Sequence, residues 1–587
     1  MDSLYNFITT QDGGKKKKSK KKWSTLVHNG VLFSPPYRPH GIPVLFDGHE
    51  IKLPPEAEEV ATLYARCLDT EYVTNGRFNR NFWKSWKPLV YPLGVTSLDK
   101  CDFTRIHQHL LDKKLADSNR TTEEKKAAKE KREKALTHFR AAYLDGHEEH
   151  VGNFLVEPKG IFVGRGCHPK LGTVKARVMP SDLTINIGKS SPIPKIYYLS
   201  RETFELVEME GHNWGEIIHD NRVEWIASWR DTVMGKRKYV WLSDHSRFKS
   251  ASDMKKFDLA RRLKKRIHRI RDENMTHYRS NDRQMVQLAT ATYLIDKLAL
   301  RVGNEKGDDE ADTVGLTSLR VEHINFDGDE TITLDFLGKD SMRYYNTVKV
   351  DQIIYHNLMS FTSGKQPSDP LFDLVGSSDL NEYLQQYMKG LTAKVFRTFN
   401  ATNLFQTRLR KIRKKFPMEG REKVKIETVT ETGSEAGAET RDGPVLTPEE
   451  MKQIMEMYER ASIEVAKYCN HRKKVVKSLK KQLQKIKDTI EQLRRDKKRL
   501  QAKKNRTKTI AKRITRYNQK IKVAKARLAL KNEMKDISLT TSKVNYIDPR
   551  VVVSFAKYFN IPLGKFYSSS LLKKFNWAFE TDVDYRF

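Results

Sequence analysis

Residues 541–550 have the sequence TSKVNYIDPR. Asp548 followed by Pro549 is the pattern of a helix N-cap and a proline in the first turn, so we expect a helix to begin there. Tyr546 then lies on the loop before that helix, held in place but open to a partner. A tyrosine hydroxyl can act as a nucleophile and form a covalent intermediate. Because tyrosines on loops are common, this stretch alone leaves both a catalytic and a structural Tyr546 open.

The charge of the chain narrows the function classes. The 587 residues are enough for several domains, and their formal net charge is +35. Such an excess favours a polyanionic partner, nucleic acid first and a membrane surface second. The sequence has no run of about 18 apolar residues and no signal-peptide pattern, so we expect a soluble intracellular protein.

The cysteines argue against a zinc site and a disulfide framework. They are far apart and form no Cys-x-x-Cys pair, which favours a reducing compartment. The four are Cys67, Cys101, Cys167 and Cys469.

The N-terminal segment 1–22 is short and polar and ends in a lysine run over residues 15–22. A lysine run without an apolar period predicts a disordered basic tail. It could be a nuclear localisation signal, a nonspecific DNA contact or only a solvated tail.

Residues 23–246 have the composition of a folded region. Short apolar runs broken by prolines favour edge strands, and residues 54–69 and 77–86 favour helices. A capping box at Thr121 predicts a charged helix that extends to about residue 142. Residues 174–186, 223–229 and 238–242 alternate as strands do, so the region from 164 to 242 is β-rich. The histidines of HEEH at 147–150 are three residues apart, not the four of a metalloprotease helix.

The loop at residues 164–172, GRGCHPKLG, combines three glycines with three basic side chains. The P-loop spacing is absent here and elsewhere, so we do not expect a requirement for ATP. Glycines let a backbone approach a phosphate, which makes Arg165, His168 and Lys170 candidate DNA contacts. An ordinary basic turn is the alternative.

The third quarter of the chain supplies two candidate arginines. Leu288, Thr292, Ile295 and Ala299 recur at spacings of 4, 3 and 4 and predict a buried helix with Gly303 as its C-cap. Arg301 then lies at a buried helix end and needs an anionic partner, which could be the carboxylate of Glu305 or a phosphate. Arg397 lies in a segment that can be helical, GLTAKVFRTF at 390–399.

A lysine and a histidine complete the set of candidates. Alternation on both sides of residues 338–341 predicts a β-hairpin with Lys339 at its tip, where a lysine can also serve only solubility. The insertion at about 416–444 is rich in Gly, Glu and Thr and predicts a flexible loop. A helix from Thr447 ends near His471, which alone could equally be a structural cap.

Residues 472–535 form a highly basic arm. Two heptad seams separated by the polar segment 503–508 predict an antiparallel coiled-coil hairpin. The arm holds 26 lysines and arginines against four carboxylates, a net charge of +22. It could contact DNA phosphates without recognising sequence, or serve as a spacer between His471 and Tyr546.

Five sequence motifs resemble the active-site motifs of eukaryotic DNA topoisomerase I, the type IB family, and they follow one another along the chain in the same order as in that family. The resemblance extends over nearly the whole chain from Trp23 to Phe587 and includes the loop at 164–170. The motifs are LALRVGNEK (298–306), DFLGKDS (335–341), LTAKVFRT (391–398), CNH (469–471) and TSKVNY (541–546).

The resemblance implies a multidomain α+β fold that encircles DNA as a clamp. It implies a cap at 23–246, with a helical lobe near 50–135 and a β-rich lobe. A mainly α catalytic core at 247–471, similar to tyrosine recombinases, precedes the coiled-coil linker 472–535. A C-terminal domain at 536–587 carries the nucleophile. The short tail and the insertion at 416–444 depart from the family pattern and leave regulation and partner docking open.

The resemblance also implies chemistry. Arg301 and Arg397 would clamp the phosphate, His471 would donate a further hydrogen bond, and Lys339 would protonate the leaving 5′-oxygen as general acid. Tyr546 would become linked to the 3′-phosphate, and neither ATP nor a metal would be needed.

The implied partner is double-stranded DNA, bound by a monomer in the nucleus. Camptothecin-type inhibitors would bind the cleaved complex beside Arg165, Asp340 and Asn545. The expected DNA contacts are Arg165, His168, Lys170, Asp340, Lys543 and Asn545.

Two other classes use similar features. A tyrosine recombinase has the same residue types but needs sequence-specific base contacts and oligomer-forming segments, which we cannot identify in the sequence. A non-catalytic basic coiled-coil protein that organises chromatin would not need all five candidate side chains.

Overall fold

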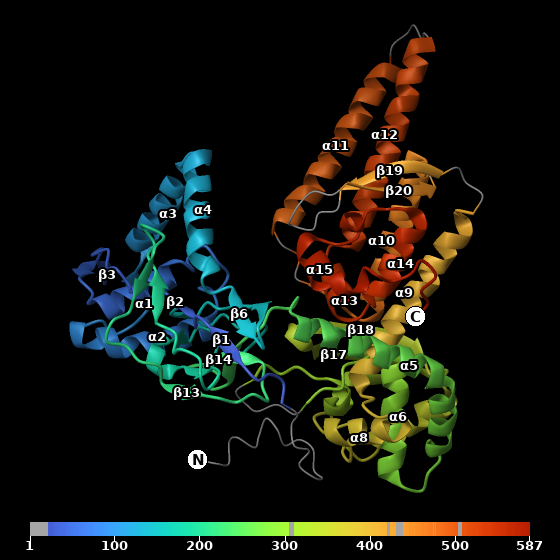
Figure 1. Cartoon of the computed structure of the whole chain (residues 1–587), viewed down its shortest axis with the longest axis horizontal. Coiled ribbons are helices and arrows are strands. Elements are labelled where there is room, and N and C mark those ends of the chain that lie inside the picture. Colours follow the sequence, from blue (N-terminus) through green and yellow to red (C-terminus); the bar gives the residue numbers. More distant parts are fainter. Residues whose placement is uncertain are drawn as a thin grey trace. The chain divides into compact units, whose positions relative to one another are not determined.

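The computed structural model describes residues 21–304, 310–419, 423–429, 438–444, 446–473, 475, 477–502 and 508–587 (Figure 1). The predicted basic tail lies outside the described residues except for its last two. The chain is a mixed α/β multidomain protein that divides into two compact units. The first unit is Met1–Ser252 with Lys306–Asp312, and the second is Asp253–Glu305 with Thr313–Phe587.

The first unit contains several small sheets, which confirms the predicted β-rich character. One sheet has the strand order β13-β10-β14-β15, in which β14 and β15 pair antiparallel with Trp225 opposite Trp241. The strands of this unit are β1 (Leu26–His28), β2 (Leu32–Phe33), β3 (Val44–Phe46), β4 (His49–Ile51), β5 (Cys101–Asp102), β6 (Ala141–Leu144), β7 (His147–His150), β8 (Gly160–Ile161), β9 (Val174–Lys175), β10 (Thr184–Asn186), β11 (Tyr197–Leu199), β12 (Leu206–Glu208), β13 (Glu216–Ile218), β14 (Trp225–Arg230) and β15 (Arg237–Trp241).

The helices of the first unit are α1 (Pro55–Ala65), α2 (Gly76–Val90), α3 (Thr104–Asn119) and α4 (Thr122–Thr137). Phe78, Phe82 and Trp86 are four residues apart on α2, so they share one face and are fully buried. The capping box at Thr121 is confirmed. The helix it begins ends at Thr137, before the predicted residue 142, because residues 141–144 pair with β1 as a strand.

The second unit is mainly helical. Its main helices are α5 (Arg247–His277), α6 (Arg283–Leu298), α7 (Gln352–Thr362), α8 (Ser377–Tyr387), α9 (Ala393–Lys415), α10 (Pro448–Tyr468), α11 (Lys477–Gln501), α12 (Lys508–Glu533), α13 (Leu539–Asn545), α14 (Pro549–Phe559) and α15 (Ser569–Lys574). The first six residues of α5 belong to the first unit. No helix in the described part of the chain is long and apolar enough to cross a membrane.

A three-stranded sheet, β16 (Ile324–Gly328), β17 (Thr331–Gly338) and β18 (Met342–Lys349), packs in the second unit. The predicted hairpin is confirmed, since β17 and β18 pair along their length up to Gly338 opposite Met342. Lys339 begins the three-residue connection. Asp340 and Ser341 follow it with φ angles of 68° and 55°, a left-handed backbone that turns the chain sharply.

The predicted end of the helix before Arg301 is wrong. Helix α6 ends at Leu298, and Ala299 is its C-cap with φ 49°. Gly303, with φ 86°, is therefore not a helix cap. A glycine is needed there because its backbone crosses that of Gly315, and a Cβ atom on Gly303 would lie 2.8 Å from the Gly315 Cα. Arg301 therefore lies on an irregular segment just beyond the helix, and this crossing holds that segment in place. Glu305, the carboxylate considered as a partner of Arg301, lies outside the described residues.

The insertion is not a loop throughout. Within it, β19 (Lys423–Val429) and β20 (Ala438–Pro444) pair as antiparallel strands, where the composition predicts a flexible segment. The amino-acid composition of a segment indicates how little apolar surface it can bury, and so favours disorder. It does not show whether two stretches of the segment can pair with each other as strands.

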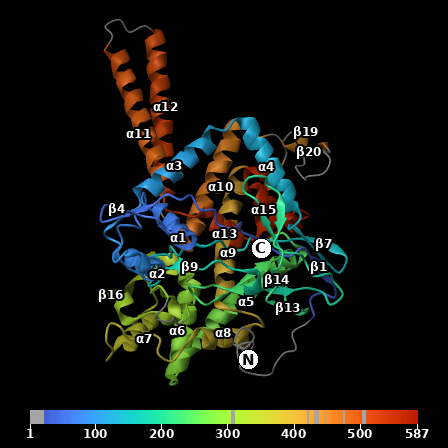
Figure 2. The same cartoon turned by 90° about the vertical axis from the view of Figure 1, so that its left-hand side faces the viewer.

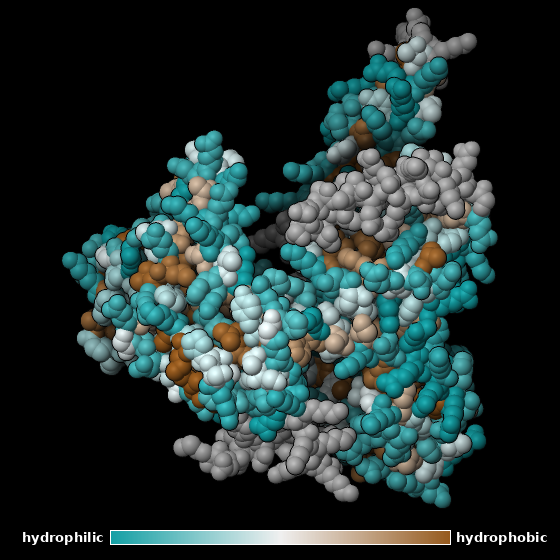
Figure 3. All heavy atoms as spheres, in the orientation of Figure 1, coloured by the Kyte–Doolittle hydropathy of each residue, from teal (hydrophilic) through white to brown (hydrophobic). Residues whose placement is uncertain are grey.

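Helices α11 and α12 lie side by side in both views and extend away from the rest of the second unit (Figures 1 and 2). Ile490 and Leu500 are buried, whereas hydrophilic residues predominate on the face of this arm that Figure 3 shows. A small apolar cluster of Ile463, Ala466 and Ile537 packs where the arm meets α10. The coiled-coil geometry itself stays a prediction.

Helix α7 offers a matched test of the second unit's core. Phe361 is 1% exposed and packs against Phe372, whereas Met359 on the same helix is 45% exposed. We expect Phe361→Ala to destabilise the second unit by about 3–5 kcal/mol, because it leaves a cavity. Met359→Ala should change stability by about 0.5 kcal/mol or less. Chemical denaturation of the full chain measures both, and equal shifts of the midpoint would contradict this packing.

Candidate active site

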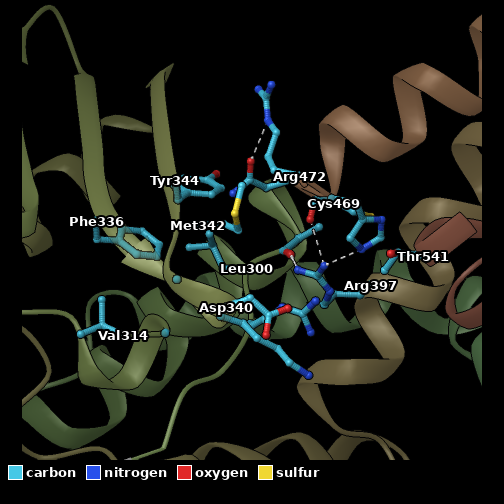
Figure 4. Close-up of a pocket in the computed structure, with 17 residues that line it drawn as sticks. Leu300, Val314, Phe336, Asp340, Met342, Tyr344, Arg397, Cys469, Arg472 and Thr541 are labelled. Atoms are coloured by element: carbon cyan, nitrogen blue, oxygen red, sulfur yellow. Dashed lines mark hydrogen bonds between the residues drawn. The ribbon is translucent and has the colours of Figure 1, made fainter. Parts of the chain in front are cut away.

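Most of the predicted catalytic residues line one pocket of the second unit (Figure 4). The pocket is built from the segment after α6, the β17–β18 hairpin tip, α9, the residues after α10 and the first turn of α13. Four of the five candidates line it: Arg301, Lys339, Arg397 and His471. Its other lining residues are Ala299, Leu300, Val314, Gly315, Phe336, Gly338, Asp340, Met342, Tyr344, Cys469, Asn470, Arg472 and Thr541.

Arg397 is buried and held by two helix ends. Its Nη1 donates to the carbonyl of Ala299, and its Nη2 donates to the carbonyl of Cys469 at 3.0 Å. Ala299 and Cys469 are the C-caps of α6 and α10, where carbonyls lack helical partners and the helix dipole is negative. No described carboxylate lies within ion-pair distance of Arg397, and its buried Nε has no acceptor among the described residues. The guanidinium is thus stabilised without being neutralised.

Tyr546 lies against this cation. The Arg397 Cζ lies 4.9 Å from the centre of the tyrosine ring, and Arg301 Nη1 donates to the tyrosine hydroxyl at 3.2 Å. The sequence predicts a Tyr546 that is open to a partner, but its side chain is buried, with 5% exposed. The difference arises because Tyr546 is the C-cap of α13 and packs into the main core rather than on an open loop.

The electrostatics of the pocket favour the tyrosine anion. Burial alone raises the pKa of Tyr546, but the charges of Arg397 and Arg301 outweigh it and lower the pKa below that of a free tyrosine. A lowered pKa increases the fraction of phenolate, which is the nucleophilic form. Two arginines whose guanidiniums suit phosphate oxygens therefore also favour the phenolate of Tyr546.

His471 stacks on Tyr546, with ring centres 5.1 Å apart and planes 22° apart. Burial, aided by the charges of Arg397 and Arg301, lowers the pKa of His471 to about 3, so the ring is neutral at physiological pH. Its Nε2 lies 3.3 Å from Arg397 Nη2, and its Nδ1 lies 2.7 Å from the hydroxyl of Ser542. His471 follows the C-cap of α10, as the sequence predicts.

The predicted DNA contacts in the second unit fall in different environments. Asp340 lines the pocket at the hairpin tip, and Asn545 is exposed, with its amide donating to the Thr541 carbonyl at 3.1 Å. Lys543 instead donates to the Phe566 carbonyl at 3.0 Å and lies over the Tyr458 ring. Burial lowers the pKa of Lys543. Its contacts are those of a residue that supports α13, and its DNA contact stays a prediction.

The basic loop of the first unit is ordered by its own residues. His168 is buried, its Nδ1 accepts from the Lys170 backbone N–H at 3.1 Å, and its ring meets Phe162 edge-on. Lys170 Nζ donates to the Val233 carbonyl at 3.1 Å, whereas Arg165 is exposed. Of the three, Arg165 is best placed to meet a ligand in solution.

Sequence reasoning missed two residues that hold the nucleophile. Thr402 is fully buried, and its hydroxyl donates to the Tyr546 carbonyl at 2.8 Å and accepts from the Asp548 N–H. Ser542 contacts His471. The helical spacing of Ser542, four residues before Tyr546, was a signal that could have identified it. Nothing in the sequence pairs Thr402 with a residue 144 positions away.

Among the described residues, no group of three His, Cys, Asp or Glu side chains could hold a metal ion. The pocket's charged lining is mainly cationic, and Asp340 is the only carboxylate among the described residues that line it. The arrangement suits an anionic ligand, and arginine guanidiniums match phosphate oxygens well.

Three family models match the chain in sequence order. Residues 21–242 match the eukaryotic DNA topoisomerase I DNA binding fragment, and residues 245–505 match the catalytic core of the same family. Residues 518–587 match the C-terminal topoisomerase domain.

The chain is similar to named relatives over most of its length. DNA topoisomerase 1 beta of Arabidopsis thaliana is 41% identical over 97% of the chain. DNA topoisomerase 1 of Homo sapiens is 38% identical over 96%, and that of Caenorhabditis elegans is 39% identical over 97%. The chain spans 59% of the length of the Arabidopsis protein, 72% of the human one and 69% of the nematode one. By these matches, the chain belongs to the eukaryotic DNA topoisomerase I family.

Proposed function

We propose that this chain relaxes DNA supercoils by cutting one strand through a 3′-phosphotyrosine link, letting the free end rotate, and resealing the strand. The observation that supports this best is the Tyr546 hydroxyl, bonded to Arg301 and packed against Arg397 and His471 beside an anion-binding pocket. Family membership supports the same activity.

The two arginines would act twice in cleavage. Before attack, their charges lower the pKa of Tyr546 and favour its phenolate. During attack, negative charge grows on the nonbridging phosphate oxygens, and the same guanidiniums would stabilise it. The Arg397 Nε–H, without an acceptor among the described residues, would be available to such an oxygen.

Lys339 would be the general acid. Lys339 precedes the sharp turn at Asp340 and Ser341 and is an exposed lining residue of the pocket, where an ammonium could protonate the departing 5′-oxygen. His471 would donate from Nε2 to a nonbridging oxygen once the phosphate takes the place of Arg397 at that nitrogen. The energy of the broken bond would be kept in the phosphotyrosine, so the reverse reaction would need neither ATP nor a metal.

DNA is the proposed partner, bound by a monomer in the nucleus. The arm with its net charge of +22, and Arg165, Asp340 and Asn545, would contact the duplex. A clamp made by the two units remains part of the proposal. Camptothecin-type compounds are the proposed ligands of the cleaved complex.

A tyrosine recombinase is the alternative with the same residue types, and the family matches favour the topoisomerase. Relaxation of plasmids of unrelated sequence separates the two, and EDTA tests the proposed independence of a metal. Relaxation that needs one specific sequence, or that EDTA abolishes, would contradict the proposal.

Removing the nucleophilic oxygen is the most direct test. Tyr546→Phe should abolish plasmid relaxation and leave DNA affinity near that of the wild type, because only the hydroxyl is lost. Tyr558→Phe is the matched control: its hydroxyl accepts from the Met418 N–H, and we expect normal relaxation. Gel assays of relaxation and of covalent adducts measure both. If the Tyr546→Phe variant still relaxes plasmid, Tyr546 is not the nucleophile.

The role of Lys339 as general acid can be tested with a substrate whose leaving group needs no proton. Lys339→Ala should slow cleavage of a normal phosphodiester by about 10²–10⁴-fold. A substrate with a 5′-thiolate leaving group needs no proton and should largely restore the rate. Lys349→Ala on the same hairpin is the control, since Lys349 is exposed and pairs with Asp329 and Glu330. Without rescue by the thiolate substrate, Lys339 has another role.

The arm can be shortened without disturbing its base. Replacing residues 479–529 by a short Gly/Ser linker removes 20 lysines and arginines and three carboxylates, and it retains the Arg472–Asp536 ion pair. Single-turnover cleavage should persist, because no proposed catalytic residue is removed. The salt dependence of DNA binding should flatten by about 0.9 in log–log slope per lost phosphate contact.

Single-molecule relaxation should then show more turns per cleavage event, because electrostatic drag on the rotating DNA is lost. A second variant, with Lys480, Lys481 and Lys485 changed to Gln, keeps the helices and removes charge only. If neither variant changes the salt slope or the step size, the arm is a spacer.

A further inference from the structure

Ser542 connects the backbone of Tyr546 to the imidazole of His471. It lies on α13 and is 1% exposed, and its carbonyl accepts the N–H groups of Tyr546 at 2.9 Å and Ile547 at 3.0 Å. Its hydroxyl lies 2.7 Å from His471 Nδ1. One residue therefore contacts both the backbone of the proposed nucleophile and the imidazole that stacks on it.

The hydrogen bonds of His471 define where its proton lies. A guanidinium can only donate, so Nε2 accepts from Arg397 Nη2 at 3.3 Å. A neutral imidazole with an acceptor at Nε2 carries its proton on Nδ1. Nδ1 must then donate to the Ser542 hydroxyl, because the ring lies where an unpartnered N–H is costly.

The other groups around His471 do not provide a partner for Nδ1. Arg397 from α9 and Arg301 from the segment after α6 both oppose a positive charge on the ring. Cys469 accepts from Arg397 through its backbone, and Tyr546 meets the ring by stacking. Within the described residues, Ser542 is the hydrogen-bond partner of Nδ1.

We propose that Ser542 is a positioning residue that holds the His471 imidazole in register with the scissile phosphate and pairs with Nδ1 in either neutral tautomer. This rests on the proposed function of the pocket. In the free enzyme the hydroxyl accepts from Nδ1–H. When a phosphate oxygen replaces Arg397 at Nε2, that nitrogen must carry the proton, and the serine O–H turns to donate to Nδ1. Nδ1 loses a proton to water and Nε2 gains one from water, so the net charge of the ring is unchanged.

A hydroxyl is suited to this task because it is both donor and acceptor, and an alanine is neither. Ser542→Ala should slow single-turnover cleavage by about 10-fold, the effect expected for one unmade buried hydrogen bond. Ser542→Thr keeps the hydroxyl and should recover most of the rate. Ser462→Ala is the matched control, a buried serine whose hydroxyl donates to the Tyr458 carbonyl. It should cleave as the wild type does.

A double-variant cycle separates positioning from folding. If Ser542 acts through the imidazole, Ser542→Ala should cost about 10-fold in the wild type and almost nothing in a His471→Ala background. Equal costs in the two backgrounds would overturn the proposal. So would equal losses in the Ala and Thr variants, or wild-type cleavage by Ser542→Ala. Thermal midpoints and DNA affinity identify any variant that has lost its fold, and the measurement below then decides.

Nitrogen NMR of ¹⁵N-histidine-labelled full-length protein, assigned with His471→Gln, tests the contact without any catalysis. The wild type should show His471 neutral at pH 6, with an Nδ1–H proton protected from exchange with water. This signal should persist in Ser542→Thr and disappear in Ser542→Ala. An Nε2–H tautomer in the free wild type would contradict the proposal. Because this readout needs no DNA, its outcome is independent of whether the chain relaxes supercoils.

Discussion

The buried guanidinium of Arg397 is the interaction on which the active site depends. A buried charge is strongly unfavourable unless it is bonded, and here the bonds come from the C-cap carbonyls of α6 and α10 rather than from a carboxylate. Arg397 therefore joins three helices of the second unit at one point. The arrangement stabilises the cation and leaves its charge available to an anion.

The properties of the neighbouring side chains follow from this charge. Tyr546 and His471 are both buried and both lie beside Arg397, and the arginines lower both pKa values for opposite reasons. They lower the pKa of Tyr546 by favouring its anion, and they lower the pKa of His471 by opposing its cation. The pocket thus holds a neutral imidazole beside a hydroxyl that is prepared to lose its proton.

Sequence reasoning succeeded where local rules decide the outcome. The capping box at Thr121, the helix that begins after Asp548, and the β17–β18 hairpin with Lys339 at its tip are confirmed, because caps and alternation act within a few residues. It failed where distant segments meet. The role of Gly303 depends on its crossing with Gly315, and the burial of Tyr546 depends on α9 and α10. The sequence likewise did not show that the Lys543 ammonium donates to the Phe566 carbonyl, a contact between segments 23 residues apart.

The sequence by itself determined the family, the identity of the five candidate side chains and the concentration of charge on the arm, because motifs and composition are properties of the chain order alone. Only the tertiary structure decided that Arg301, Arg397 and His471 all contact Tyr546, since they come from segments as much as 245 residues apart. It also decided the state of each group. Burial and the distance to a charge set a pKa, and neither exists until α6, α9, α10 and α13 have packed together.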